Sequence, residues 1–274
     1  MRLCLNTATC RPYRLPLPDL ARLAAKVGFT AIEPWMDEIE AYRQAGGQLP
    51  DLCSLFADLG LAVSNIITFP NWLADGAAAR EAAKGAIQQE MQMVRALGAC
   101  TMAAPPVGMP DRTDLDRIAE CYRILCALGA EQGVMPLLEP WASSPVLGRL
   151  AQALYVTAAC GHRNAGLLLD VYHLHKAGSG FAGLRLLNGA VMPVFHINDY
   201  PADPPRQQLR VRHRVLPGDG VAPLRTIVQS LSEAGFRGDL SLELFPDEPG
   251  PGSAEVLLQK SFERLSRLVD PAWA

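Results

Sequence analysis

Three carboxylates and one imidazole end or interrupt short apolar runs in the second half of the chain. Glu139 ends PLLE, Asp170 ends GLLLD, His196 lies within VMPVFHIND and Glu243 lies within LSLELF. A charge buried in such a run is costly unless it finds a cation or a hydrogen-bond partner. Any one of these residues alone would more often cap a helix or pair with an arginine. The four together predict a site for one divalent metal ion, and their mainly oxygen donors suit Mn²⁺, Mg²⁺, Co²⁺ or Zn²⁺.

Residues near these runs are candidates for substrate contacts. His173 and His175 lie just beyond GLLLD; His173 could bind a substrate oxygen or support a metal ligand, and His175 is expected farther away. Arg214 precedes the turn PGDG, where it could hold a substrate oxygen or lie at the surface. Trp141 and Glu33 lie at predicted strand ends, and we predict that both contact the substrate.

Five aromatic residues lie near the predicted strand ends. They would form either an apolar wall for the C–H faces of a sugar or part of an ordinary core. These residues are Trp35, Phe69, Trp72, Trp141 and Phe245.

Apolar strands and amphipathic helices alternate about eight times along the chain. Strands are predicted over 3–7, 30–34, 61–68, 100–104, 134–139, 165–170, 191–198 and 240–245. Helices are predicted over 18–27, 49–59, 77–97, 114–132, 145–160, 224–234 and 254–269. The pattern predicts an α/β fold, a (β/α)8 TIM barrel with 1–274 as a single domain, since a doubly wound sheet needs fewer units. The Pro-rich segment 201–208 is predicted to be a lid.

In such a barrel, polar side chains at the carboxyl ends of the strands converge on one cavity. Glu139 and Glu243 are expected on strands three apart, so they should face each other across that cavity with the metal between them. One glutamate could then remove a proton from carbon while the other, or the same one, returns it elsewhere. The metal would polarise the ketone and hold the enediolate.

Composition narrows the class of protein. The chain has 274 residues, is 49% hydrophobic and contains no apolar run long enough for a membrane helix, and its N-terminus turns polar too soon for a signal peptide. We therefore expect a cytoplasmic protein with no membrane partner. The net charge of −3 and the absence of a Lys/Arg run argue against a nucleic-acid partner. Seven cysteines without CxxC spacing are expected to be reduced and mostly buried. The sequence leaves open whether the chain forms a homo-oligomer.

The segments PLLEPW (136–141), GLLLDVYHLH (166–175), VFHINDY (194–200) and HRVLPGDG…GFRGDLSLELF (213–245) resemble the xylose-isomerase-like TIM-barrel family of sugar isomerases and epimerases. With the opening MRLCLNTAT (1–9), they look most similar to the inosose (2-keto-myo-inositol) isomerases. The resemblance implies metal ligands at Glu139, Asp170, His196 and Glu243, with Glu139 and Glu243 as the catalytic pair. It also implies substrate contacts from His173 and Arg214.

Two departures from the family pattern limit what the resemblance implies. Ketose epimerases of the family carry a further glutamate six residues beyond the first ligand, where this chain has Pro145. A tagatose- or psicose-type epimerase is therefore disfavoured. Trp141, in the segment after Glu139, also differs from the usual isomerase sequence and is expected to reshape the substrate pocket.

The leading hypothesis is a divalent-metal-dependent isomerase or epimerase of a keto-sugar or keto-inositol, acting through a metal-bound cis-enediolate between two glutamates. A dehydratase or lyase on the same scaffold is the alternative, because both reactions begin with the same deprotonation. A non-catalytic sugar-binding barrel is a further alternative, which the paired glutamates disfavour. A DNA-repair endonuclease of related fold is disfavoured, because it needs a multi-zinc site rich in histidine and a basic groove. This chain has five histidines and a net charge of −3. The expected partner is a small-molecule carbohydrate, and no Gly-rich phosphate cradle with an adjacent lysine is present.

Overall fold

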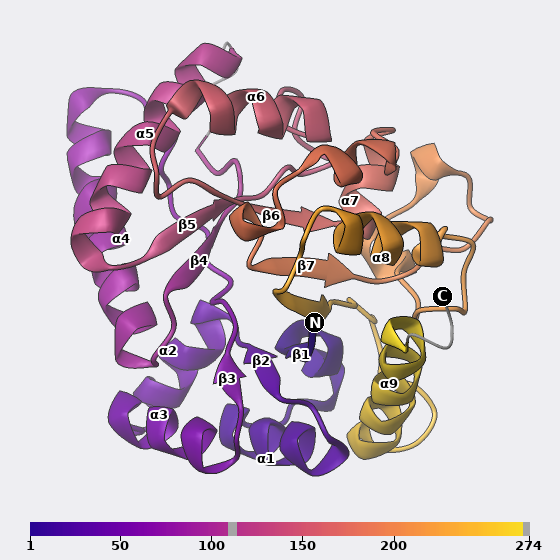
Figure 1. The fold of residues 1–274 in the computed structure, drawn as a ribbon. Helices are drawn as coiled ribbons and strands as arrows, with labels where there is room; N and C mark the ends of the chain where they lie inside the picture. Colours follow the sequence, from indigo (N-terminus) through magenta and orange to yellow (C-terminus); the bar gives the residue numbers. More distant parts are fainter. Residues whose placement is uncertain (109–113, 271–274) are drawn as a thin grey trace.

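The computed structural model describes residues 1–108 and 114–270, and this part of the chain forms a ring of parallel strands surrounded by helices (Figure 1). The strands, in chain order, are β1 (Arg2–Asn6), β2 (Ala31–Glu33), β3 (Ala62–Val63), β4 (Thr101–Ala104), β5 (Met135–Leu138), β6 (Gly166–Asp170), β7 (Val194–Ile197) and β8 (Asp239–Leu242). The longer helices are α1 (Leu17–Val27), α2 (Met36–Gln44), α3 (Leu49–Asp58), α4 (Ala77–Ala96), α5 (Leu115–Gln132), α6 (Leu150–Cys160), α7 (Val171–Lys176), α8 (Leu224–Glu233) and α9 (Ala254–Val269).

The strands pair in the order β3-β2-β1-β8-β7-β6-β5-β4. The ring closes beyond β3, where Ile66 forms a parallel bridge with Met102 of β4. The backbone N–H of Ala103 donates to the Ile66 carbonyl over 3.0 Å at this closure. The predicted TIM barrel is therefore confirmed, and β2, β4, β6, β7 and β8 are buried along their whole length, as is typical of parallel strands covered on both faces.

Strand alternation explains why the candidate residues point into the barrel. Leu137, Leu168 and Val194 belong to a small inner cluster of buried residues, whereas Leu138, Leu169 and Phe195 belong to the large cluster between sheet and helices. Successive side chains of a strand point to opposite faces. Residues two positions beyond the members of the inner cluster therefore also face the interior. These are Glu139, Asp170 and His196.

The helices end where the sequence predicts. Gly28 after α1 and Gly133 after α5 have φ of 118° and 69°, the left-handed conformation that glycine adopts without steric cost at a helix C-terminus. All seven cysteines are free, and five are buried, as expected. Within residues 1–108 and 114–270, no helix has both the length and the apolar composition needed to cross a membrane.

Three local features differ from the sequence prediction. α2 was not predicted, because only Met36 and Ile39 of its nine residues are buried and the apolar pattern is weak. α6 begins at Leu150 rather than near 145, because residues 142–148 form turns stabilised by the Ser144 hydroxyl, which accepts from Leu147 N over 3.0 Å. The predicted strand 61–68 is a short ladder, Ala62–Val63, followed by isolated bridges.

No helix was predicted between residues 170 and 191. The connection from β6 to β7 is made by α7 and two 3-10 turns, Ala182–Leu186 and Gly189–Val191. α7 begins directly after Asp170, whose side chain accepts from His173 N over 2.6 Å as an N-cap. One carboxylate thus both ends β6 and starts the helix that carries His173.

Candidate active site

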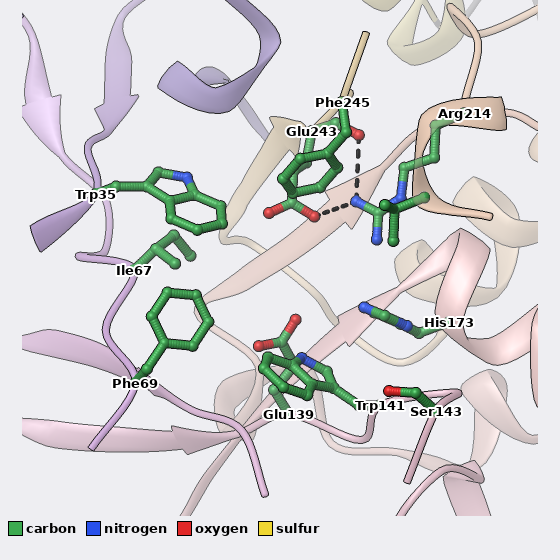
Figure 2. Close-up of a pocket in the computed structure, with 11 residues that line it drawn as sticks. Trp35, Ile67, Phe69, Glu139, Trp141, Ser143, His173, Arg214, Glu243 and Phe245 are labelled. Atoms are coloured by element: carbon green, nitrogen blue, oxygen red, sulfur yellow. Dashed lines mark hydrogen bonds and ion pairs between the residues drawn. The ribbon is translucent and has the colours of Figure 1, made fainter. Parts of the chain in front are cut away.

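A cavity of about 260 Å³ opens at the carboxyl ends of the barrel strands (Figure 2). It is lined by five of the predicted site residues and by further aromatic and aliphatic side chains. Its lining comprises Trp35, Ile67, Phe69, Glu139, Trp141, Ser143, His173, Val211, Arg214, Glu243 and Phe245. Figure 2 shows the carboxylates of Glu139 and Glu243 facing each other across this cavity.

Asp170, His196 and Glu243 form a buried group whose potential ligand atoms all lie within 4.8 Å of one another. His196 Nδ1 is 3.3 Å from Glu243 Oε2 and 4.0 Å from Asp170 Oδ2. Nδ1 is also buried without a hydrogen-bond partner among the described residues. An unpartnered imidazole nitrogen between two carboxylates is a donor set that fits a divalent cation. The structure thus brings together three of the four predicted ligands, and Glu139 lines the adjacent cavity.

The carboxylates of the site differ in their affinity for protons. Burial raises the pKa of Glu139 to about 8, and the nearby charges of Glu243 and Asp170 act in the same direction. Burial also opposes ionisation of Glu243, but the positive charges of His196 and Arg214 outweigh it and hold the pKa of Glu243 well below its usual range. Without a cation, the site therefore keeps Glu243 charged and disfavours charge on Glu139.

Arg214 is fully buried at the edge of this group. Its Nη1 forms an ion pair with Glu243, drawn as a dashed line in Figure 2, and lies 3.4 Å from Asp170 Oδ2. Its guanidinium carbon lies 4.8 Å from the ring centroids of both Tyr172 and Phe245. Nε and Nη2 have no hydrogen-bond partner within the described part of the chain. The side chain lines the cavity and retains donors for an oxygen placed there.

Aromatic rings line the cavity as a connected series. Trp35 is 5.3 Å from Phe69 and 5.7 Å from Phe245, measured between ring centroids. Phe69 is 5.8 Å from Trp141, which stacks on His173 at 6.4 Å. We call these five rings the aromatic collar.

Burial lowers the pKa of His173 to about 4, so the imidazole is neutral near pH 7.

Trp72, the fifth aromatic residue predicted near the strand ends, lies elsewhere. Its ring packs 5.8 Å from Tyr122, and its Nε1 donates to the Pro105 carbonyl over 2.6 Å. Ordinary core packing, the alternative interpretation, applies to this residue.

Glu33 was predicted to contact the substrate, but it is fully buried beside His196. Its carboxylate accepts hydrogen bonds from Asn6, Asn65 and Ser241 and lies 3.0 Å from His196 Nε2. It is not among the described residues that line the cavity. This placement does not fit a substrate contact, because both carboxylate oxygens already have protein partners.

His175 and the predicted lid lie outside the cavity lining. The His175 ring stacks on Tyr200 with centroids 3.7 Å apart. Segment 201–208 is attached to α7, since Lys176 Nζ donates to the Gln207 carbonyl and Arg206 Nη1 to the Lys176 carbonyl, over 2.5 and 3.2 Å. Val211, which follows the predicted lid in the sequence, is among the residues that line the cavity.

Asp199 is a buried residue that the sequence analysis missed. Its carboxylate accepts backbone N–H groups from Gly218, Gly220 and Ala222 over 2.9, 3.1 and 2.8 Å. Its backbone also pairs with Val215, the residue after Arg214. The signal in the sequence was the PGDG turn, which needs an acceptor for its backbone donors. Asp199 thus anchors the loop that carries the buried arginine.

Comparisons with known proteins agree with this fold. Residues 21–268 match the family model described as a xylose isomerase-like TIM barrel. The chain is 29% identical to the inosose isomerase of Bacillus velezensis over 98% of this chain and 97% of that protein. It is 27% identical to the 3-dehydroshikimate dehydratase of Pseudomonas aeruginosa over 84% of this chain, but spans only 36% of that protein. The crystal structure of the IOLI protein with a bound zinc atom superimposes with a TM-score of 0.89 at 24% identity, covering 98% of each chain.

Proposed function

The chain belongs to the xylose isomerase-like TIM barrel family, and we propose that it is a divalent-metal-dependent isomerase or epimerase of a keto-inositol or related keto-sugar. The observation that carries the proposal is the buried group Asp170, His196 and Glu243, with an unpartnered His196 Nδ1 between the two carboxylates. Similarity to an inosose isomerase over nearly the whole chain supports the same reaction class.

Asp170, His196 and Glu243 would hold the metal ion, with Glu139 as the fourth ligand predicted from the sequence. Their buried, mainly anionic donors suit a divalent cation, and a cation would offset the repulsion among the three carboxylates. Such an ion, when bound, polarises a carbonyl and stabilises negative charge on oxygen.

The protein side chains carry out the proton transfer. Glu139 and Glu243 flank the cavity, so one of them removes the proton from the carbon next to the ketone, which becomes an enediolate. The other glutamate, or the same one, returns a proton to a neighbouring carbon or to the opposite face. Arg214 uses its unpartnered N–H groups to hold a substrate oxygen, and neutral His173 contacts another.

The aromatic collar supports a compact, ring-shaped substrate with C–H faces. Trp35, Phe69, Trp141 and Phe245 present apolar surface around a cavity of about 260 Å³, and they limit the entry of water. Arg214 is the one lysine or arginine among the described residues that line the cavity, and it is already paired with Glu243. This arrangement favours a polyhydroxylated ketone without a phosphate group.

The proposal is tested by replacing Glu243 with Gln and following exchange of the substrate α-proton in D₂O, with inososes and Mn²⁺. The variant should keep the fold and lose exchange by at least about a hundredfold, the usual scale of acid–base catalysis. Glu233→Gln, on the exposed side of α8, is the matched control and should exchange at the wild-type rate. Undiminished exchange in Glu243→Gln, or a wild-type protein that binds no divalent metal by elemental analysis, would refute the mechanism.

A dehydratase is the second candidate, supported by the similarity to a 3-dehydroshikimate dehydratase over 84% of this chain. The same deprotonation would then be followed by loss of a β-hydroxyl group as water. NMR and mass spectra of the products separate the two reactions, because isomerisation and epimerisation leave the mass unchanged and dehydration lowers it by one water.

A further inference from the structure

The carboxylate of Glu33 is the centre of a buried hydrogen-bond network that includes His196 of the proposed metal site. Oε1 accepts from Asn65 Nδ2 over 2.9 Å. Oε2 accepts from Asn6 Nδ2 over 2.8 Å and from the Ser241 hydroxyl over 2.6 Å. His196 Nε2 lies 3.0 Å from both oxygens. Every one of these five side chains is fully buried, so water does not compete for the carboxylate.

This network determines the orientation of the His196 ring. A carboxylate accepts hydrogen bonds and cannot donate when ionised, so Nε2 must carry a hydrogen toward Glu33. The other ring nitrogen, Nδ1, then faces Glu243 and Asp170 and has no partner among the described residues. Turning the ring over would place carbon atoms against the buried carboxylate and lose its histidine donor, which is costly for a fully buried group.

We propose that Glu33 is a positioning residue that holds His196 through Nε2–H and thereby presents Nδ1 as the metal-binding nitrogen. This inference rests on the proposed function, because it assumes that the group formed by Asp170, His196 and Glu243 binds a divalent ion. It assigns to Glu33 a role that acts through His196 and excludes direct contact with the substrate.

Glu33→Gln is the informative substitution, because glutamine keeps the shape of the side chain and replaces one acceptor oxygen with an NH₂ donor. Either orientation of the new amide places that donor against an existing donor, Asn65 on one side or Asn6 and Ser241 on the other. Where the NH₂ faces His196, Nε2 must become the acceptor, and the ring hydrogen moves to Nδ1. Metal binding at Nδ1 would then leave Nε2 without a hydrogen, as an imidazolate, or break its hydrogen bond to the amide, and either outcome lowers metal affinity.

The test measures metal affinity rather than turnover, by titrating metal-free protein with Zn²⁺ against a competing chelator. Glu33→Gln should bind Zn²⁺ about 10–100-fold more weakly than the wild type, the usual effect of losing a hydrogen-bond partner of a ligating histidine. Glu38→Gln is the matched control: this partly buried glutamate accepts from Thr7 and Trp35 N and does not touch His196. It should bind Zn²⁺ within about threefold of the wild type, since none of its partners is a proposed ligand.

A second measurement does not depend on whether Glu33→Gln folds. In wild-type protein labelled with ¹⁵N-histidine and loaded with Zn²⁺, the His196 ring should carry its hydrogen on Nε2 and bind metal through Nδ1, with the signal assigned from a His196→Gln variant. Metal bound through Nε2, or equal Zn²⁺ affinity in folded Glu33→Gln and wild type, would overturn the inference. A wild-type protein that binds no divalent ion would instead refute the proposed function itself.

Discussion

The indole Nε1–H of Trp35 donates to the side-chain Oδ1 of Asn6 over 2.8 Å, and the amide nitrogen of Asn6 donates to Glu243 Oε1 over 3.2 Å. A ring of the aromatic collar and a candidate catalytic carboxylate therefore share one amide. Asn6 is fully buried, and its Oδ1 also accepts from Ala8 N over 3.0 Å. The orientation of the Asn6 amide is set by these partners, so the Trp35 ring and the Glu243 carboxylate are positioned together.

Trp35→Phe keeps an aromatic ring in the collar and removes the donor to Asn6. We expect the free energy of unfolding to fall by about 1 kcal/mol, the usual net value of a hydrogen bond. We also expect KM to rise severalfold, because Asn6 no longer ties the ring to Glu243. Trp72→Phe is the control, since that indole donates to Pro105 O away from the cavity. Urea unfolding should show similar losses of stability in Trp35→Phe and Trp72→Phe. Steady-state kinetics should show a raised KM in Trp35→Phe alone.

Asp199→Ala removes the acceptor for three backbone N–H groups in the loop that carries Arg214. We expect a loss of about 2–4 kcal/mol in unfolding free energy and a reduced kcat/KM, since three partly buried donors would lose their acceptor and the loop positions the guanidinium. Asp219→Ala, in the same loop, loses only surface ion pairs with Lys260 and Arg264 and should cost less than about 1 kcal/mol. Wild-type kcat/KM in a folded Asp199→Ala would show that the loop does not depend on this carboxylate.

Glu90 predicts a pH dependence of stability that is independent of the active site. Burial raises its pKa to about 7, and the charge of Glu40 acts in the same direction. The native carboxyl therefore holds its proton more tightly than in the unfolded chain, so unfolding free energy should fall as pH rises from about 4.5 through 7. Glu90→Gln should stabilise the protein at pH 8 and have little effect at pH 4.5.

Urea unfolding of wild type and Glu90→Gln at the two pH values checks this prediction. Glu40→Gln should give part of the stabilisation expected for Glu90→Gln at pH 8, because it removes the neighbouring charge but leaves Glu90 partly buried. A Glu90→Gln effect of the same size at both pH values would contradict the predicted shift.

The barrel could be predicted from the sequence because its signals are local. Strand alternation, amphipathic helices and glycines such as Gly28 and Gly133 depend on neighbours within one element. The inward direction of Glu139, Asp170 and His196 follows from the same alternation, so the candidate metal site could also be predicted. α2 was missed because it buries few apolar residues and leaves a weak pattern.

The relationships within the site were decided only by the tertiary structure. Glu33 and His196 are 163 positions apart, and Glu33 and Ser241 are 208 apart, so their contacts exist only once the ring of strands has closed. The strand-end position of Glu33 suggested a substrate contact, but the folded chain supplies donors to both of its oxygens and leaves it outside the cavity lining. The sequence by itself determined which residues face the barrel interior, through the two-residue period of each strand. Barrel closure decided which of them meet one another and which remain open to a substrate.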